Sequence, residues 1–349
     1  MDYFKRVAAQ TPTKFWINNA TRTQAQMAID AGAVGSTQNP SYVYKMLTND
    51  EEKEYALAKL DEIILSVDDD DEVQVQLQRE LVSGIAKLFM PMFERSKGEL
   101  GYVSVQGNPF KENVDDIVRC AEFNAQAAPN IMAKIPATKE GLEAIEYVAR
   151  KGIAINATEV MAVRQALDVC KAYEKATKDM AQKAPIYFSH ITGIYDEYLQ
   201  KVVKERNIDI SPDALWQAGM SIAKKTYWMV REKGYKIGFI GGGARGLHHF
   251  TEMVGADAVV TINWSGTADK LLEKDDPVVQ RFLMQVPYSV VDELVEKIDD
   301  YRRGYFVNAI CEDEYVDFGP VVLFRQSFEV AWKSADKLIK ERRADLAKR

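Results

Sequence analysis

One lysine stands inside an apolar segment that ends in proline. Lys134 lies within IMAKIPAT, residues 131–138. A lysine held in a protein interior loses hydration, so its neutral amine is favoured and its pKa falls. A neutral amine can form an imine with a ketone or aldehyde, and the imine acts as an electron sink for cleavage of the neighbouring C–C bond. The alternative is a lysine with a buried stem whose ammonium reaches solvent.

Other polar residues stand where short apolar runs end. If these runs are strands of one parallel barrel, their carboxyl ends share a face, where the active sites of such barrels lie. The residues are Asn18, Asn19, Thr37, Gln38, Asn39, Ser104, Gln106, Asn156, Thr158, Ser189 and His190, followed by the glycine-rich 241–245. The glycines indicate either an anion site made of backbone N–H groups or only a tight turn. The pattern predicts amides and hydroxyls around Lys134.

Eight β-like runs alternate with helical patterns along the chain. They cover residues 13–18, 33–37, 101–106, 131–135, 153–157, 185–189, 237–241 and 257–262. Their nearly continuous apolar character is typical of strands buried on both faces. We therefore predict an α/β fold, a (β/α)8 TIM barrel with extra helices, and keep an open α/β sheet as the alternative.

We expect residues 1–349 to form a single barrel domain with additions. Residues 47–100 are predicted to be a helical insertion and 275–349 a helical C-terminal extension, which packs on the barrel or on a neighbouring subunit of a homo-oligomer. The acid run Asp68–Glu72 is interpreted as a solvated loop. Trp216, Tyr227 and Trp228 have helical spacing and are expected in the core.

Composition excludes several classes of protein. The 349 residues are 47% hydrophobic with net charge −7, and no basic tract points to nucleic acid. No apolar run is long enough for a membrane span, so we expect a cytoplasmic protein. The cysteines Cys120, Cys170 and Cys311 and the three histidines lack the spacing of a disulfide framework or metal centre.

Several segments together resemble the transaldolase family in order and spacing. They are FWINNAT, GSTQNPS, VSVQ, IMAKIPATKEGLEAI, GIAINAT and GGGAR. The resemblance is good over residues 13–165 and weaker over 185–265. It implies a (β/α)8 barrel in which Lys134 forms a Schiff base with a sugar or sugar phosphate. The lysine is itself the electron sink, so neither a metal nor an organic cofactor is expected.

The resemblance assigns roles to individual residues. Seven match family active-site positions, namely Asn39, Ser104, Lys134, Asn156, Thr158, Ser189 and Arg245, and Thr37 is expected to bind substrate beside them. Three positions depart. Asn18 replaces the aspartate that handles the substrate proton, Gln106 replaces a glutamate as in the fructose-6-phosphate aldolase branch, and Ile194 replaces a phosphate-binding arginine.

Three groups could replace the missing base. Glu159 follows Thr158 and is either a substitute base or an acid of the first helical turn capped by Thr158. Asp196 is interpreted as a helix-start acid, and His190 as a structural residue or proton carrier.

The residues are compatible with more than one function. We expect a Schiff-base enzyme that cleaves a ketose or transfers its three-carbon ketol unit. The alternatives are a catalytically impaired sugar-binding or regulatory protein, and a Schiff-base enzyme of altered reaction such as a dehydratase.

Overall fold

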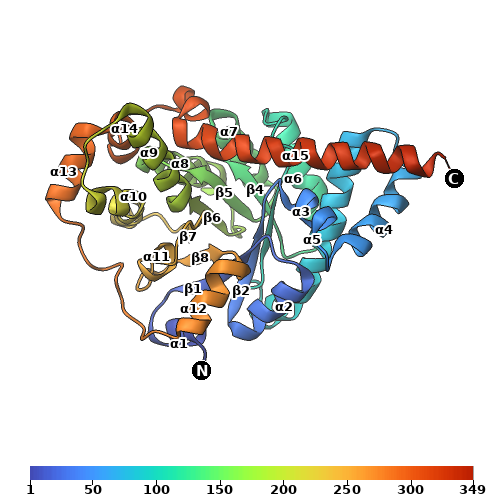
Figure 1. Ribbon diagram of the computed structural model, residues 1–349, viewed down its shortest axis with the longest axis horizontal. Helices are drawn as coiled ribbons and strands as arrows, with labels where there is room; N and C mark the ends of the chain where they lie inside the picture. Colours follow the sequence, from blue (N-terminus) through green and yellow to red (C-terminus); the bar gives the residue numbers. More distant parts are fainter. Residues whose placement is uncertain (349) are drawn as a thin grey trace.

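The computed structural model describes residues 1–348 and contains a closed barrel of eight parallel strands (Figure 1). The strands pair in sequential order, and β8 pairs with β1 to close the ring. Their bounds are β1 (Lys14–Asn18), β2 (Ala33–Gln38), β3 (Val103–Gln106), β4 (Ile131–Pro136), β5 (Ile155–Val160), β6 (Ile186–His190), β7 (Gly238–Gly241) and β8 (Val259–Ile262). Each predicted run overlaps one of these strands, so the TIM barrel is confirmed and the open sheet is wrong.

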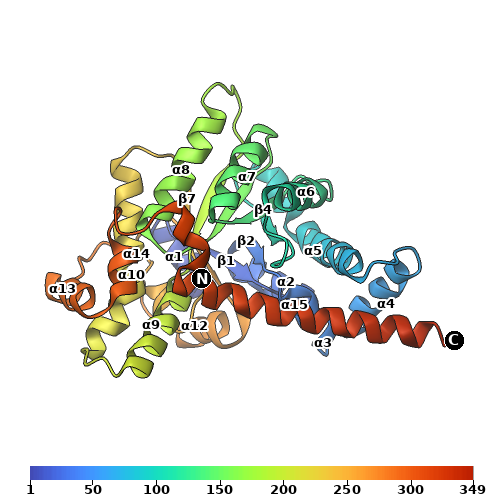
Figure 2. The same ribbon diagram turned by 90° about the horizontal axis from the view of Figure 1, so that it is seen from above.

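Helices surround the barrel and extend beyond it (Figure 2). Those of the first half are α1 (Tyr3–Gln10), α2 (Arg22–Ala31), α3 (Tyr42–Thr48), α4 (Lys53–Ile64), α5 (Asp70–Arg95), α6 (Val114–Ala125), α7 (Lys139–Arg150) and α8 (Val163–Thr177). Those of the second half are α9 (Thr192–Arg206), α10 (Pro212–Glu232), α11 (His248–Thr251), α12 (Asp269–Lys274), α13 (Tyr288–Lys297), α14 (Asp299–Tyr305) and α15 (Gly319–Leu346), with a π-type segment (Trp264–Ala268) and a 3-10 helix (Glu312–Asp317). No helix within residues 1–348 is both long and apolar enough to cross a membrane.

The barrel interior is apolar below Lys134 and polar above it. The lower layer is a cluster formed by Trp16, Tyr102, Met132, Ala154, Ile240 and Val259. Side chains alternate across a strand, so Lys134 faces the same way as Met132 but one layer higher. Lys134 pairs in register with Gln106 on β3 and with Asn156 on β5. The sheet therefore fixes these three polar residues side by side.

The segment after Lys134 turns sharply from strand to helix. The Thr138 side chain accepts a hydrogen bond from the backbone N–H of Gly141 at 3.1 Å and so caps α7. A Cβ atom at Gly141 would lie 1.7 Å from the carbonyl oxygen of Pro136, so only glycine fits. The threonine and glycine of KIPAT-x-EG thus serve the turn that holds β4 in place.

The acid run Asp68–Glu72 was predicted to be a solvated loop, and this prediction is wrong. Asp69 caps α5 by accepting from the N–H of Glu72, and the acids after it form the first turn, where the helix dipole favours them. Asp70 also accepts from Arg343 at 2.8 Å, and Asp71 accepts from Trp332 at 3.3 Å. These residues therefore attach the C-terminal helix.

The C-terminal extension packs against the barrel, and Arg349, its last residue, lies outside the described residues. In Figures 1 and 2, α15 runs as a long rod across the molecule from α9 towards α4, and it contacts both, together with α3 and α5. Trp216 and Trp228 are about half exposed, so their predicted core position is wrong, whereas Tyr227 is buried. Trp216 lies instead against the ring of His248, with centroids 4.9 Å apart.

Candidate active site

Lys134 lies in a cavity of about 550 Å³ at the carboxyl end of the barrel. Its side chain is buried, and desolvation lowers its pKa from 10.5 to about 8, against an opposing effect of the charge on Glu159. Its Nζ lies 5.8 Å from the ring centre of Phe328, which belongs to α15. The amine is therefore closer to its neutral, nucleophilic form than that of a lysine in water.

Six of the residues given a catalytic or binding role from the sequence line this cavity, and Asn19 lines it with them. The six are Asn18, Thr37, Asn39, Lys134, Ser189 and Arg245. They come from β1, β2, the segment after β2, β4, β6 and the segment after β7. Strand order places them around one opening although the sequence separates them widely. The cavity roof includes Phe324, Ser327 and Phe328 of α15.

Asn18 belongs to a network of uncharged groups. Its Oδ1 accepts from the Thr37 hydroxyl at 2.8 Å, and its Nδ2 donates to Asn263 Oδ1 at 2.9 Å. Thr37 also lies 2.7 Å from the Thr261 hydroxyl. This network can orient substrate hydroxyls, but an amide cannot take a proton from them.

Asn39 is fixed by its neighbour across the strand ends. Asn19 Nδ2 donates to Asn39 Oδ1 at 2.9 Å, and the Asn39 backbone N–H donates to Asn19 Oδ1 at 3.0 Å. Asn19 adopts a left-handed conformation with φ of 46°, which asparagine tolerates better than most residues. Ser41 adds a 2.5 Å hydrogen bond to the same Asn39 oxygen.

A chain of hydrogen bonds crosses three strands beside Lys134. Ser189 donates to Asn156 Oδ1 at 2.7 Å, and Asn156 Nδ2 donates to Ser104 Oγ at 3.1 Å. Asn156 and Ser104 are fully buried, so they reach the cavity through Ser189. The hydroxyl of Thr158 is also buried, and no described residue accepts or donates a hydrogen bond there.

Glu159 is the one acid among the predicted catalytic residues. It is fully buried at the end of β5, with φ of 61°, where the register with β6 is irregular. Gln106 Nε2 donates to its Oε1 at 2.9 Å, while Oε2 has no partner among the described residues. Because α8 begins only at Val163, the interpretation of Glu159 as a helix-start acid is wrong.

The surroundings of Glu159 keep its proton affinity high. Burial raises its pKa, and the hydrogen bond from Gln106 and the charge of Lys134 act in the opposite direction. The neighbouring Glu112 has a pKa raised to about 9 by burial and by the charge of Glu159. A carboxyl with a raised pKa beside a lysine with a lowered one is an arrangement suited to proton transfer near neutral pH.

Arg245 lines the cavity but is already paired. Its Nε donates to Glu197 at 2.5 Å, and both side chains are about half exposed. The backbone N–H groups of Arg245 and Gly246 both donate to His249 Nδ1 at 3.2 Å, and that of Gly242 donates to the His190 carbonyl oxygen. Three N–H groups of the glycine-rich loop are thus bonded within the protein and do not form the suggested anion cradle.

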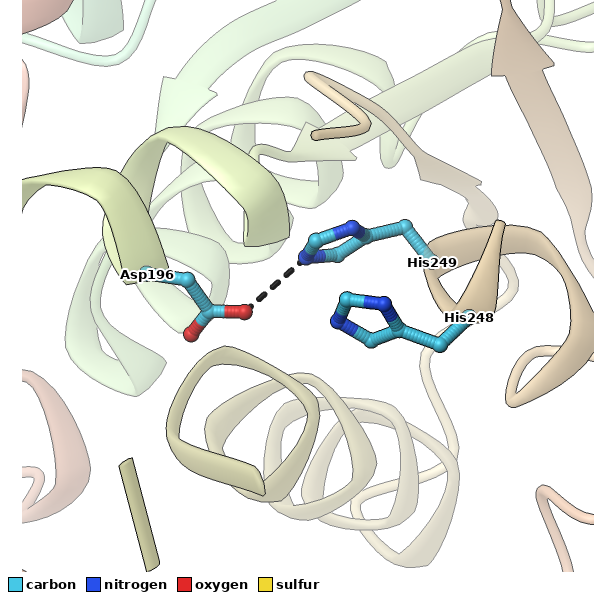
Figure 3. A group of neighbouring side chains, drawn as sticks. All are labelled: Asp196, His248 and His249. Atoms are coloured by element: carbon cyan, nitrogen blue, oxygen red, sulfur yellow. Dashed lines mark hydrogen bonds and ion pairs between the residues drawn. The ribbon is translucent and has the colours of Figure 1, made fainter. Parts of the chain in front are cut away.

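Asp196, His248 and His249 form a cluster behind this loop (Figure 3). His249 Nε2 lies 2.9 Å from Asp196 Oδ2, and the other oxygen of Asp196 accepts from the Gly219 N–H at 2.6 Å. Since His249 Nδ1 accepts the two loop N–H groups, Nε2 carries the proton and donates to Asp196. Both ring nitrogens are therefore occupied by hydrogen bonds, which argues against metal ligation by His249.

Two other sequence interpretations need correction. Asp196 is buried inside α9, where it fixes the glycine-rich loop through His249, and is not an ordinary helix-start acid. His190 is buried, neither ring nitrogen has a hydrogen-bond partner among the described residues, and desolvation lowers its pKa to about 3. It therefore stays neutral near pH 7 and is not a proton carrier. Ile194 is buried in α9 and leaves no cation at the family arginine position.

Sequence reasoning missed several residues of the cavity. Lys45 lines it and follows Ser41 by one helical turn, a spacing that could have drawn attention to it. Thr261 and Asn263 lie at the end of the last strand, where a polar residue at a barrel strand end was a usable signal. Phe324 and Phe328 gave no signal, because only the packing of α15 brings them over Lys134.

Sequence comparison identifies the family of this fold and site. The family described as Transaldolase/Fructose-6-phosphate aldolase matches residues 15–303 of the chain. The chain belongs to this family. The transaldolase of Thiobacillus denitrificans is 25% identical over 238 residues, and that of Mycobacterium tuberculosis strain H37Rv is 28% identical over 243 residues.

The relatives of the transaldolase family are matched over part of their length. The alignments cover 61% of this chain and 62% of the Thiobacillus protein, and 62% of this chain and 61% of the Mycobacterium protein. Transaldolase 1 of Streptomyces avermitilis is 29% identical over 54% of this chain and 52% of its own length. The apo crystal structure of Gox0644 aligns with a TM-score of 0.36 and 11% identity over 82% of this chain and 88% of that one.

Proposed function

We propose that this protein is a Schiff-base enzyme that cleaves a ketose or transfers its three-carbon ketol unit to an aldehyde. The observation that carries the proposal is the burial of Lys134 in a cavity rich in hydroxyl and amide groups, with a pKa lowered to about 8. Membership of the transaldolase and aldolase family supports it.

The reaction begins at the amine of Lys134. Its nitrogen attacks the carbonyl carbon of the ketose to give a carbinolamine, which takes up a proton and loses water to become an iminium ion. Thr37, Asn39 and Ser189, which line the cavity, orient the sugar hydroxyls. Ser104 and Asn156 hold Ser189 from behind through hydrogen bonds, and Thr158 lies buried on the same strand as Asn156.

Bond cleavage requires a base for the hydroxyl on the departing fragment. We assign this role to Glu159, which does not line the cavity and would take the proton through one bridging water. Asn18 is an amide in a neutral network, whereas Glu159 is a carboxyl that senses the charge of Lys134. The base takes the hydroxyl proton, the C–C bond breaks, and its electrons pass into the iminium to leave an enamine on Lys134. An aldehyde departs. Gln106 holds Glu159 in position.

The enamine has two fates. Protonation and hydrolysis would release a three-carbon ketone, which makes the enzyme a lyase. Attack of the enamine on another aldehyde would make it a transferase. A sugar-binding protein without turnover is the second candidate, and the uncharged network at Asn18 favours it.

Borohydride trapping tests the proposal. The protein is incubated with dihydroxyacetone or fructose 6-phosphate, reduced with borohydride and analysed by peptide mass spectrometry. We expect added mass at Lys134 and its loss in Lys134→Met. Lys45→Met, tested with the uncharged dihydroxyacetone, serves as a control for labelling at a second cavity lysine. Labelling elsewhere, or none with either ketone, would refute the covalent mechanism and support the sugar-binding alternative.

A further inference from the structure

The cavity around Lys134 has a one-sided charge. Three cationic side chains line it, Lys45, Lys134 and Arg245, and none of the aspartates and glutamates within residues 1–348 does. A cleft lined by charges of one sign attracts a ligand of the opposite sign. The surroundings of the proposed imine-forming lysine therefore favour a substrate that carries an anionic group.

The three cations differ in their availability. Lys134 is the proposed nucleophile, and the side chain of Arg245 is paired with Glu197. Lys45 makes no salt bridge: no carboxylate oxygen among the described residues lies within 4.0 Å of its Nζ. The buried Glu52, at the start of α4, is instead paired with Arg22 at 3.0 Å.

Lys45 retains donors that can face a ligand. Its ammonium has three N–H donors, and one of them reaches the backbone carbonyl oxygen of Asn19 at 2.5 Å. Burial lowers the pKa of Lys45, with no charged partner opposing the effect. An anion at this ammonium would supply both missing acceptors and a compensating charge.

Two neutral residues extend the site around Lys45. Ser41, four residues earlier, and Asn49, just after α3, line the same cavity. The hydrogen bond between Ser41 and Asn39 connects this end of the cavity to the predicted sugar-binding residues. The site thus offers one cation with hydroxyl and amide groups beside it.

We propose that Lys45, with Ser41 and Asn49, binds a phosphate or carboxylate group of the substrate whose carbonyl reacts with Lys134. The inference deepens the proposed function and rests on it for the identity of the bound molecule. It places the anionic end of the substrate against α3. Near the glycine-rich loop, Ile194 stands where the family has an arginine, and Arg245 is paired with Glu197. That part of the site therefore has less positive charge available for an anion.

Direct anion binding tests the site without turnover. Inorganic phosphate and malonate are titrated into the protein while its thermal unfolding is followed, with sodium chloride of equal ionic strength as the reference. We expect saturable stabilisation of the wild type, and at least a tenfold weaker apparent affinity in Lys45→Met. Lys53→Met is the matched control, because Lys53 is exposed at the start of α4. Equal affinity in Lys45→Met, or no stabilisation of the wild type beyond chloride, overturns the inference.

Imine trapping then distinguishes the source of the anion. Half-saturating concentrations are compared for dihydroxyacetone, dihydroxyacetone phosphate and a keto-sugar acid. We expect Lys45→Met to raise the half-saturating concentration of dihydroxyacetone phosphate or of the keto-sugar acid at least tenfold more than that of dihydroxyacetone. The ligand with the larger rise shows whether the site binds a phosphate or a carboxylate. An equal rise for all three overturns the inference. If no ligand is trapped but phosphate or malonate binding still depends on Lys45, the anion site stands and the proposed function fails.

Discussion

Gln106 Nε2 donates to Glu159 Oε1 at 2.9 Å, joining β3 to β5 above Lys134. The family glutamate on the third strand is glutamine here, and a carboxyl appears two strands away on the other side of the lysine. This hydrogen bond depends on both departures from the family pattern, since a glutamine amide can donate to a carboxylate and an ionised glutamate cannot. The carboxyl at this end of the barrel therefore lies on β5 in this protein and not on β3.

Replacing Glu159 should stop C–C cleavage but allow imine formation. General base catalysis is typically worth 10²–10⁴-fold, so we expect Glu159→Gln to lower ketose cleavage by about that range. Borohydride labelling of Lys134 should persist, and steady-state kinetics with fructose 6-phosphate measures the loss. Retention of more than a third of the wild-type rate would show that Glu159 is not the base.

Restoring the family aspartate at the first strand should have little effect. Asn18 Oδ1 accepts from Thr37, and its Nδ2 donates to Asn263 Oδ1. In Asn18→Asp, a carboxylate oxygen replaces Nδ2 and faces Asn263 Oδ1, unless the Asn263 side-chain amide rotates to present its NH2 group. We expect less than a tenfold rise in kcat for aldol cleavage. A larger rise would mean that the site had only lost its base and that Glu159 has another role.

Removing the buried amine should stabilise the protein near neutral pH. The pKa of Lys134 is lowered from 10.5 to about 8 in the folded protein. Below pH 8 the buried amine is charged, and this lowers the free energy of unfolding by about 3 kcal/mol. Above pH 8 the folded amine is neutral, and the cost falls to zero as pH approaches 10.5. We expect Lys134→Met to be more stable at pH 7, with the gain shrinking between pH 8 and 10.5.

Urea unfolding of the wild type and Lys134→Met across this pH range measures the difference. In the wild type, the rate of imine formation with dihydroxyacetone should rise from pH 7 and level off above about pH 8 to 9. A stability difference that does not change with pH would mean that the pKa of Lys134 is not lowered by folding.

The C-terminal helix should control the pKa of Lys134. Phe328 is buried over the lysine, so Phe328→Ala would admit water and move the pKa upwards towards its ordinary value. Losing a buried phenylalanine typically costs about 3–5 kcal/mol of stability. Val330→Ala is the control, because Val330 is 66% exposed on the same helix. The pH profile of imine formation should shift upwards in Phe328→Ala and remain in place in the control.

The buried pair behind the glycine-rich loop should be needed for the position of Arg245. Asp196→Ala leaves the His249 Nε2–H and the Gly219 N–H without their acceptor, which costs about 1–3 kcal/mol for each group. We expect a lower melting temperature and a higher KM for ketoses, with or without a phosphate group. Glu205→Ala, at an exposed position of α9, should change neither. An unchanged KM in a folded Asp196→Ala protein would remove Asp196 from the positioning of the loop.

Local sequence patterns predict the barrel better than the site. The strands carry their own signal, because segments buried on both faces are continuously apolar, and Lys134 stands out within one of them. The register shift at the end of β5, where Glu159 is buried, has no such signal. Gln165 of α8 stabilises it by donating to the carbonyl oxygens of Ala137 and Glu159, a contact made only in the folded chain.

Contacts between distant segments explain the remaining errors. The acid run near residue 70 looks like a loop until Arg343 and Trp332 are placed beside it. Lys45 looks like an ordinary helical lysine until the cavity is formed around it. In each case the side chain acquires its role from a partner far away in the sequence, and the local pattern contains no information about that partner.

The position of α15 separates access to the cavity from the stability of the barrel. Phe324 and Phe328 line the cavity from a segment that takes no part in the strand ladder, so an opening of this helix would leave the hydrogen bonds between the eight strands intact. Segments of this kind open at lower free energy than the core they cover, and amide hydrogen exchange detects such opening. Lys134 would then meet solvent far more often than the strand that carries it unfolds, and ligand entry would follow the local equilibrium of one helix.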